Sequence, residues 1–276
     1  MMVDLHIHTT ASDGSLTPGQ VVEEAALKQL AAIAVTDHDT INGVEEGLAA
    51  GKKFNIKVVP GVEFGVDYLV KETHILGYFS EENYLGIKQY FDWILEKRHE
   101  RNRMLINNLN NAGYEITIEE MYKKAGGGTP GRPHLAKCLI EKGYAANVNE
   151  TFDKILLRKD IYVPREKTSP ESVISEILNN KGIPVIAHPV YLDEEGMFDT
   201  ALREFMELGL KGIEVIHSDH SARDTGKYMK FAMDNDLIMT GGSDFHGANK
   251  DNAFIGMPEV KDDLYHGLAA LLYKSD

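Results

Sequence analysis

The sequence has almost none of the groups that build disulfides, thiolate metal sites and membrane spans. Cys138 is the only cysteine among 276 residues, which excludes an internal disulfide and a metal site built from thiolates. No apolar run approaches the roughly 20 residues that a membrane-spanning helix needs. The first residues also lack the basic and apolar regions of a signal peptide. We therefore expect a cytoplasmic protein that is not bound to a membrane.

Basic residues are scarce relative to acidic ones. The sequence has 29 lysines and arginines against 43 aspartates and glutamates, and a formal net charge of -14. This balance opposes a broad electrostatic hold on a phosphate backbone, so we expect no long nucleic acid as a partner. It does not exclude a small phosphorylated substrate, because bound divalent ions reverse the field locally. No feature of the sequence predicts an obligate protein partner.

Histidine, in contrast, is abundant, and two of the eleven histidines stand close together near the start. From Val3 to His8 apolar and polar residues alternate, which is the period of a β-strand. His6 and His8 therefore leave the strand on the same side and can reach one metal ion. An isolated pair of this kind is more often exposed on an edge strand. The remaining histidines favour the metal interpretation.

Strand and helix patterns alternate in two parts of the chain, residues 1–80 and 161–276. The strands are short apolar runs, and polar residues follow them, which is typical of a mostly parallel sheet or barrel. Residues 81–160 contain four helical patterns and no convincing strand. The sequence therefore predicts an α/β barrel in two parts, 1–80 and 161–276, with a helical insertion over 81–160.

Nine imidazoles and carboxylates stand at the predicted junctions between strands and loops. They are His6, His8, Asp13, His38, Glu63, His74, His188, Asp244 and His246. A barrel brings such junctions onto one rim, so we expect a single cluster built from distant segments. Imidazole and carboxylate without thiolate suit zinc, manganese or iron.

Seven short motifs extend over nearly the whole chain: DLHIHTTASDG, TDHDT, GVEF, THILGY, GRPH, AHP and GSDFHG. Together they resemble the motifs of the PHP (polymerase and histidinol phosphatase) family of metal-dependent phosphoesterases. The aspartate of ASDG, the insertion with GRPH, and the VPREK segment are most similar to nucleoside 3′,5′-bisphosphate phosphatases and related 5′-to-3′ exoribonucleases. The resemblance implies a distorted (β/α)7 barrel, the PHP fold, with a trinuclear metal centre.

The resemblance also divides the nine residues among as many as three divalent ions, Mn²⁺, Fe²⁺ or Zn²⁺. It implies a first site of His6, His8, Glu63 and Asp244, a second of Glu63, His74 and His188, and a third of Asp13, His38 and His246. Histidinol phosphatases of the family carry a histidine where this chain has Asp13. The implied reaction is in-line attack on phosphorus by a hydroxide between the first two ions, with the third stabilising the phosphoryl oxygens.

Four further residues are predicted to contact the substrate. Arg132 and His134 lie on the predicted insertion, where they would cover the cleft and contact a second phosphate or the ribose. A guanidinium group pairs with phosphate through two hydrogen bonds, which favours this role for Arg132 over a surface role. Arg165 and Lys167 are interpreted as substrate contacts, with solvated charges as the alternative.

Two histidines, His217 and His220, follow a predicted strand end, and either could donate a proton to the leaving oxygen. A hydrogen-bonded loop is the alternative for His217. The leading hypothesis is a phosphatase that removes the 3′-phosphate of nucleoside 3′,5′-bisphosphates or trims short RNA 5′ ends. Its partner would be a small phosphorylated nucleotide or a short oligonucleotide.

Two other functions are compatible with the resemblance. One is hydrolysis of histidinol phosphate, which Asp13 and the GRPH insertion oppose. The other is a catalytically inactive metal-binding scaffold, because the PHP domains of some polymerases are inactive. Loss of one or more ligand residues would indicate that case, and all nine are present here.

Overall fold

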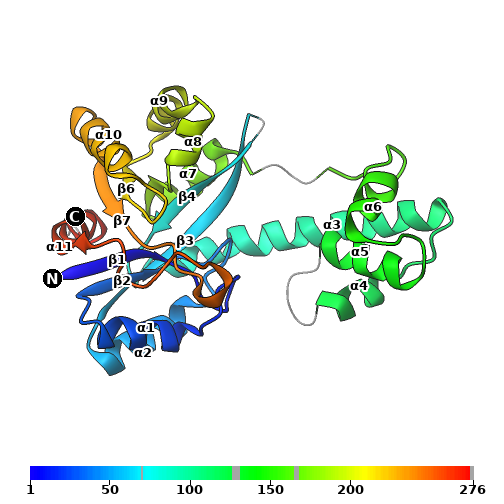
Figure 1. Cartoon of the computed structure of the whole chain (residues 1–276), viewed down its shortest axis with the longest axis horizontal. Helices are drawn as coiled ribbons and strands as arrows, with labels where there is room; N and C mark the ends of the chain where they lie inside the picture. The colour runs from blue at the N-terminus through cyan, green and yellow to red at the C-terminus, as the bar shows by residue number, and fades with distance from the viewer. Residues whose placement is uncertain (70, 126–130, 165–167, 274–276) are drawn as a thin grey trace. The chain divides into compact units, whose positions relative to one another are not determined.

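The computed structural model describes residues 1–69, 71–125, 131–164 and 168–273 (Figure 1). The chain divides into two compact units. The first, called here the barrel unit, comprises Met1–Phe91 and Lys167–Asp276, and the second, called here the helical unit, comprises Asp92–Glu166. All strands among the described residues belong to the barrel unit.

The barrel unit is built on one eight-stranded sheet with the order β7-β6-β5-β4-β3-β2-β1-β8. Its strands are β1 (Met2–Ile7), β2 (Ala32–Val35), β3 (Lys57–Tyr68), β4 (Lys71–Tyr78), β5 (Ile183–Ile186), β6 (Gly212–Ile216), β7 (Ile238–Gly241) and β8 (Val260–Lys261). Neighbours pair in parallel except at β4, which is antiparallel to β3 and β5, and at β8, which is antiparallel to β1. The predicted α/β barrel is confirmed.

The sheet closes where the segment after β7 meets β1. The backbone N–H of Asp244 donates to the carbonyl of His6 at 2.9 Å, and the N–H of His8 donates to the carbonyl of Phe245 at 2.9 Å. Gly242 permits this close approach, because a Cβ at that position would lie 2.4 Å from the backbone nitrogen of His6. Closure therefore places the first strand beside the residues that follow the seventh.

Strand β3 is longer than its sequence pattern indicates. The pattern predicts a strand from Lys57 that ends at Glu63, whereas β3 continues to Tyr68 and pairs with β4 along its whole length. Val66 and Tyr68 are buried in this continuation, so the apolar alternation extends beyond Glu63. Glu63 consequently lies within a strand, and β3 and β4 form an antiparallel pair.

Helices flank the strands of the barrel unit. They are α1 (Pro18–Leu27), α2 (Val44–Phe54), the 3₁₀ helix η1 (Tyr84–Ile87), α7 (Pro170–Asn179), α8 (Val190–Glu194), α9 (Phe198–Leu208), α10 (Ala222–Asp234), the 3₁₀ helix η3 (Gly247–Asn249) and α11 (Asp262–Leu272). Thr17 caps α1 by accepting from the Gln20 N–H, and Pro18 supplies the first helical residue. Val21 and Val22 of α1 pack with Ile33 of β2 in one apolar cluster.

The helical unit contains most of α3 (Lys88–Asn111), with α4 (Ile118–Ala125), α5 (Arg132–Glu141), α6 (Val148–Thr151) and the π-helix η2 (Phe152–Leu156). Leu105, Leu109, Leu135 and Leu139 are fully buried in its core, and Cys138 is buried among them. Amphipathic spacing on successive helices explains this core. No helix in the described part of either unit is long and apolar enough to cross a membrane.

Candidate metal centre

The first two histidines of the site leave β1 side by side. Both side chains are fully buried, and their ring centroids lie 5.3 Å apart. The pairing of β1 with β2 shifts register between Asp4 and Ile7. Thr36 stabilises the irregular section, because its hydroxyl accepts from the Ile7 N–H at 3.0 Å. The local structure thus fixes two imidazoles at the carboxyl end of one strand.

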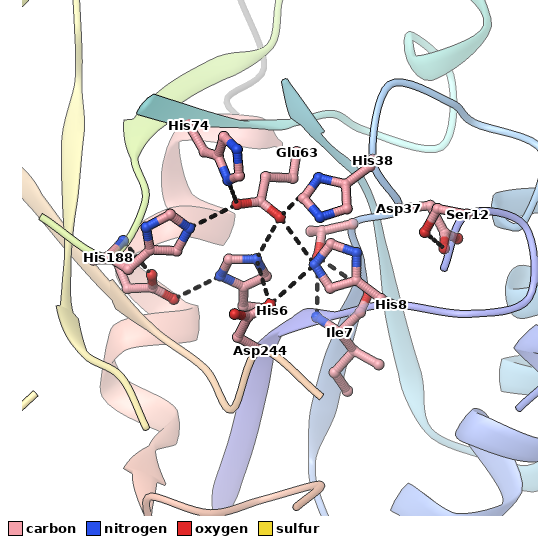
Figure 2. A network of polar contacts seen from close by, with 12 residues as sticks. His6, Ile7, His8, Ser12, Asp37, His38, Glu63, His74, His188 and Asp244 are labelled. Carbon is pink, nitrogen blue, oxygen red and sulfur yellow. Dashed lines mark hydrogen bonds and ion pairs between the residues drawn. The ribbon is translucent and has the colours of Figure 1, made fainter. Parts of the chain in front are cut away.

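Glu63 stands at the centre of the site, between two groups of imidazoles (Figure 2). It is 1% exposed, and the TDHDT loop holds its backbone, since the Asp39 N–H donates to the Glu63 carbonyl at 3.0 Å. Its Oε2 lies 3.1, 2.9 and 3.3 Å from the nearest nitrogens of His6, His8 and His38, and its Oε1 lies 2.7 and 2.8 Å from those of His74 and His188. The two oxygens of Glu63 therefore face different groups of histidines.

Asp244 completes the group on the His6 and His8 side. Its Oδ1 lies 3.1 Å from His8 Nε2 and 3.4 Å from His6 Nε2. Its Oδ2 points elsewhere, 2.8 Å from Lys250 Nζ and 3.4 Å from His217 Nε2. Asp244 adopts a left-handed φ of 53°, which is uncommon for a residue with a side chain and is typical of functional sites.

These four side chains fit a divalent cation. His6, His8, Glu63 and Asp244 place donor atoms within 4.8 Å of one another. His6 Nε2, His8 Nε2, Glu63 Oε2 and Asp244 Oδ1 are buried and have no partner with hydrogen-bond geometry among the described residues. Each such atom costs about 1–3 kcal/mol unless something binds it. Metal–ligand bonds of about 2.1 Å place neighbouring donors roughly 3 Å apart, which matches these separations.

The electrostatics of the cluster also favour a cation. Burial lowers the pKa of His6, but the carboxylates of Glu214, Glu63 and Asp244 outweigh it and hold this pKa well above its usual range. Burial also lowers the pKa of His8, but Asp244 and Glu63 outweigh it and raise this pKa to about 9. Positive charge thus stabilises the buried carboxylates, and protons or divalent ions can supply it.

A second group surrounds the other oxygen of Glu63. His74 Nδ1 and His188 Nε2 both face Glu63 Oε1, and His38 and His74 form a further donor group with Glu63. His188 has a left-handed φ of 26°, and its backbone N–H donates to Glu214 Oε2 at 2.7 Å. The residues predicted for the second site are therefore neighbours.

A third group is more exposed and centres on Asp13, whose side chain is 56% exposed. Asp13 lies 3.3 Å from His246 Nε2, 3.6 Å from His8 Nδ1 and 3.8 Å from His38 Nε2. Burial raises the pKa of Asp13, but these histidines outweigh it and lower this pKa to about 2. Asp37 holds the loop that carries Asp13, because it accepts from the Thr9 N–H and the Ser12 hydroxyl.

The three groups open onto one cavity of about 350 Å³. Its lining residues in the described part of the chain are His38, Glu63, Glu72, Thr73, His74, His188, Tyr191, Asp244 and His246. A cavity of this size accepts a small molecule rather than a folded partner. The arrangement can therefore bring donor atoms and a small anionic ligand together.

The two histidines predicted to move a proton follow strand β6. His217 is fully buried, and its Nδ1 accepts from the Asp219 N–H at 3.1 Å, so that its Nε2 faces Asp244. His220 Nδ1 lies 3.2 Å from the Val215 carbonyl, and burial lowers the pKa of His220 to about 4. Neither is among the described residues that line the cavity. Their role in proton transfer stays a prediction.

The predicted substrate residues divide between the helical unit and undescribed positions. Arg132 lies over the Phe152 ring at 5.7 Å, and His134 Nδ1 accepts from the Gly131 N–H at 3.2 Å at the start of α5. Arg165 and Lys167 lie outside the described residues. Contact of these four residues with substrate stays a prediction.

Glu214 and Lys250 contact predicted ligand residues but were not themselves predicted. Glu214 is a fully buried carboxylate in the middle of β6, 3.0 Å from His6 Nδ1. Lys250 follows the GSDFHG motif and pairs with Asp244 and Asp219. The available signal for Glu214 was an acidic residue within an apolar strand, because burial of a charge requires specific partners.

Fold and site together define an α/β barrel with groups of imidazoles and carboxylates that could hold divalent ions. The sequence model of the PHP domain matches residues 4–160, and the chain belongs to the PHP family. It is 31% identical over 252 residues to a phosphoribosyl 1,2-cyclic phosphate 1,2-diphosphodiesterase of Eggerthella lenta, covering 90% of this chain and 95% of the relative. It is 31% identical to a 3′,5′-nucleoside bisphosphate phosphatase of Chromobacterium violaceum, covering 93% and 91%, and 32% identical to the 5′-3′ exoribonuclease Rnm of Salmonella typhimurium, covering 89% and 85%.

Solved structures give the same fold. A candidate metal-dependent phosphoesterase of Bifidobacterium adolescentis matches with a TM-score of 0.72 and 27% identity, covering 99% of this chain and 96% of that one. An amidohydrolase of Chromobacterium violaceum, solved with bound sulfate and no metal, matches with a TM-score of 0.67 and 29% identity, covering 98% and 97%.

Proposed function

We propose that the protein is a metal-dependent phosphoesterase that releases the 3′-phosphate of nucleoside 3′,5′-bisphosphates. The observation that supports the phosphoesterase class most directly is Glu63, whose two oxygens face two groups of imidazoles at the cavity. Relatives similar to this chain over most of its length are named as phosphatases, phosphodiesterases and ribonucleases. A structural neighbour also binds sulfate, which has the shape of phosphate.

The ligand roles proposed for the nine residues follow their grouping. His6, His8, Glu63 and Asp244 would hold a first ion, Glu63, His74 and His188 a second, and Asp13, His38 and His246 a third. Bound divalent ions polarise phosphoryl oxygens and lower the pKa of water. Neutral imidazoles contribute no negative charge, so the site would stay cationic and attract a phosphate dianion even in an acidic protein.

The substrate is proposed from the bisphosphate phosphatase relative and from the GRPH motif. A second phosphate would distinguish a bisphosphate from a monophosphate, and Arg132 is the residue proposed to contact it. The test is release of inorganic phosphate from adenosine 3′,5′-bisphosphate and from adenosine 5′-monophosphate, with Mn²⁺, Fe²⁺ or Zn²⁺ supplied in turn. A clear preference for the bisphosphate is expected, and equal rates on both would contradict the proposal.

A cyclic phosphodiester is the second candidate substrate. It is favoured by the Eggerthella lenta relative, which is as similar to this chain as the bisphosphate phosphatase. Phosphoribosyl 1,2-cyclic phosphate and a short 5′-phosphorylated RNA belong in the same assay panel. If the cyclic ester is hydrolysed faster than every monoester, the cyclic substrate replaces the bisphosphate. A cytoplasmic location and the small-nucleotide partner stay predictions alongside this choice.

A further inference from the structure

Glu214 is a fully buried carboxylate that none of the three proposed metal sites includes, although its donor atoms also lie within 4.8 Å of those of His6 and His217. It lies in β6 between Ile213 and Val215, and its exposed fraction is 0%. An ionised carboxylate in such a position is unfavourable unless each oxygen has a partner. Oε1 lies 3.0 Å from His6 Nδ1, and Oε2 accepts from the His188 backbone N–H at 2.7 Å.

The contact with His6 fixes which of its ring nitrogens carries hydrogen. A carboxylate only accepts hydrogen bonds, and a neutral imidazole has a single N–H. A neutral His6, the form that a metal ligand must have, therefore carries its hydrogen on Nδ1, and its Nε2 lone pair is on the side of Glu63 Oε2 and Asp244 Oδ1. Only this tautomer makes His6 Nε2 a metal donor.

The contact with His188 fixes a backbone conformation. A left-handed φ such as the 26° of His188 is costly for a residue with a side chain, unless neighbouring groups stabilise it. The His188 N–H donates to Glu214 at 2.7 Å in this conformation, and the imidazole of the same residue places Nε2 2.8 Å from Glu63 Oε1. One carboxylate thus orients one histidine in each of the two groups that Glu63 joins.

We propose that Glu214 is a positioning residue that couples the first and second metal sites by fixing the His6 tautomer and the His188 backbone together. The proposal rests on the proposed function for the existence of these sites. It goes beyond that function because it assigns a role to a residue that would touch neither ion nor substrate. Removal of Glu214 should weaken two metal sites at once, although it removes no ligand.

Glu214→Gln tests the coupling, because glutamine has the same shape but only one accepting oxygen. Its single oxygen can accept from His6 Nδ1 or from the His188 backbone N–H. If it accepts from His6, the amide NH₂ faces the His188 N–H, which is also a donor. If it accepts from His188, the amide NH₂ faces His6 Nδ1 and requires the His6 tautomer with hydrogen on Nε2. Titration with Zn²⁺ against a competing chelator should show affinity for two ions reduced about 10–100-fold, the range typical of outer-shell changes. The matched control is Glu204→Gln on α9, where Glu204 accepts from Tyr68 at 2.6 Å. Unchanged affinity for both ions in Glu214→Gln, or a loss at one site alone, would overturn the coupling.

A second measurement needs no variant. Long-range ¹H–¹⁵N spectra of histidine side chains in the zinc-loaded protein should show His6 with hydrogen on Nδ1 and zinc on Nε2. A His6 whose Nδ1 carries no hydrogen would overturn the proposal even if Glu214→Gln fails to fold. Failure of the proposed function looks different. Wild-type protein would then bind two ions through Glu214-dependent sites and release no phosphate from any nucleotide.

Discussion

The barrel unit and the helical unit bury very different groups. The barrel unit encloses imidazoles and carboxylates at its centre, and several of their atoms have no hydrogen-bond partner among the described residues. In the described part of the helical unit the buried polar residues are Asn102 and Thr151, both uncharged, within an otherwise apolar core. The helical unit is therefore stabilised by its own packing, whereas the centre of the barrel is arranged for a ligand at a cost in stability.

The largest expected effect is the loss of a proposed ligand in the barrel unit. Asp244→Asn removes a charge that faces His6 and His8, and we expect both metal content and turnover to fall. Because outer-shell substitutions typically cost about 10–100-fold, turnover should fall more than roughly 100-fold. Metal analysis and phosphate release measure the two quantities, and Asp234→Asn on the exposed face of α10 is the control. A fully metallated, fully active Asp244→Asn protein would remove Asp244 from the ligand set.

A core substitution in the helical unit should lower stability without lowering metal content. Leu139 is fully buried, and Leu139→Ala should lower the free energy of unfolding by about 3 kcal/mol through lost contacts and a cavity. Metal content of the folded protein should not change. Urea unfolding followed by metal analysis checks both, with Leu95→Ala, at a position that is 40% exposed, as the control. Loss of metal from folded Leu139→Ala protein would show that the units are energetically coupled.

Metal removal should affect the barrel unit selectively. At a Mn²⁺ concentration about 100 times its dissociation constant, binding should raise the free energy of unfolding by about 2.7 kcal/mol relative to chelator-treated protein. Amide hydrogen exchange should slow in β1 and β3 and stay the same in α4 and α5. Equal protection of both units by the ion would contradict the proposal that the metal sites belong to the barrel unit.

The prediction with the smallest expected effect tests whether the helical unit takes part in substrate binding. Arg132→Ala should raise KM for adenosine 3′,5′-bisphosphate by about tenfold, the value of one hydrogen bond to a charged group, with little change in metal content. Arg103→Ala, an exposed residue of α3, is the control. Unchanged kinetics would confine the proposed chemistry to the barrel unit.

Most sequence motifs combine a strand end with an imidazole or carboxylate, which is why the gathering of these side chains around Glu63 could be predicted, whereas metal binding by them stays a prediction. The helix starts could also be predicted from the sequence, as at Thr17 and Pro18, because capping depends on neighbours in sequence. Glu214 was missed because its partner His6 lies at the other end of the chain, and no local pattern encodes a contact over that separation. The left-handed backbones of His188 and Asp244 were missed for the same reason, since tertiary contacts impose them against local preference.

The bonds between Asp244 and His6 and between His8 and Phe245 have a consequence for biosynthesis. His6 and His8 are synthesised long before Asp244, the aspartate that faces them in the folded barrel. A nascent polypeptide that ends before Asp244 would therefore lack one of the four donors proposed for the first ion. Binding of that ion would follow the docking of the segment after β7 against β1, so a loaded site would mark a molecule whose barrel has closed.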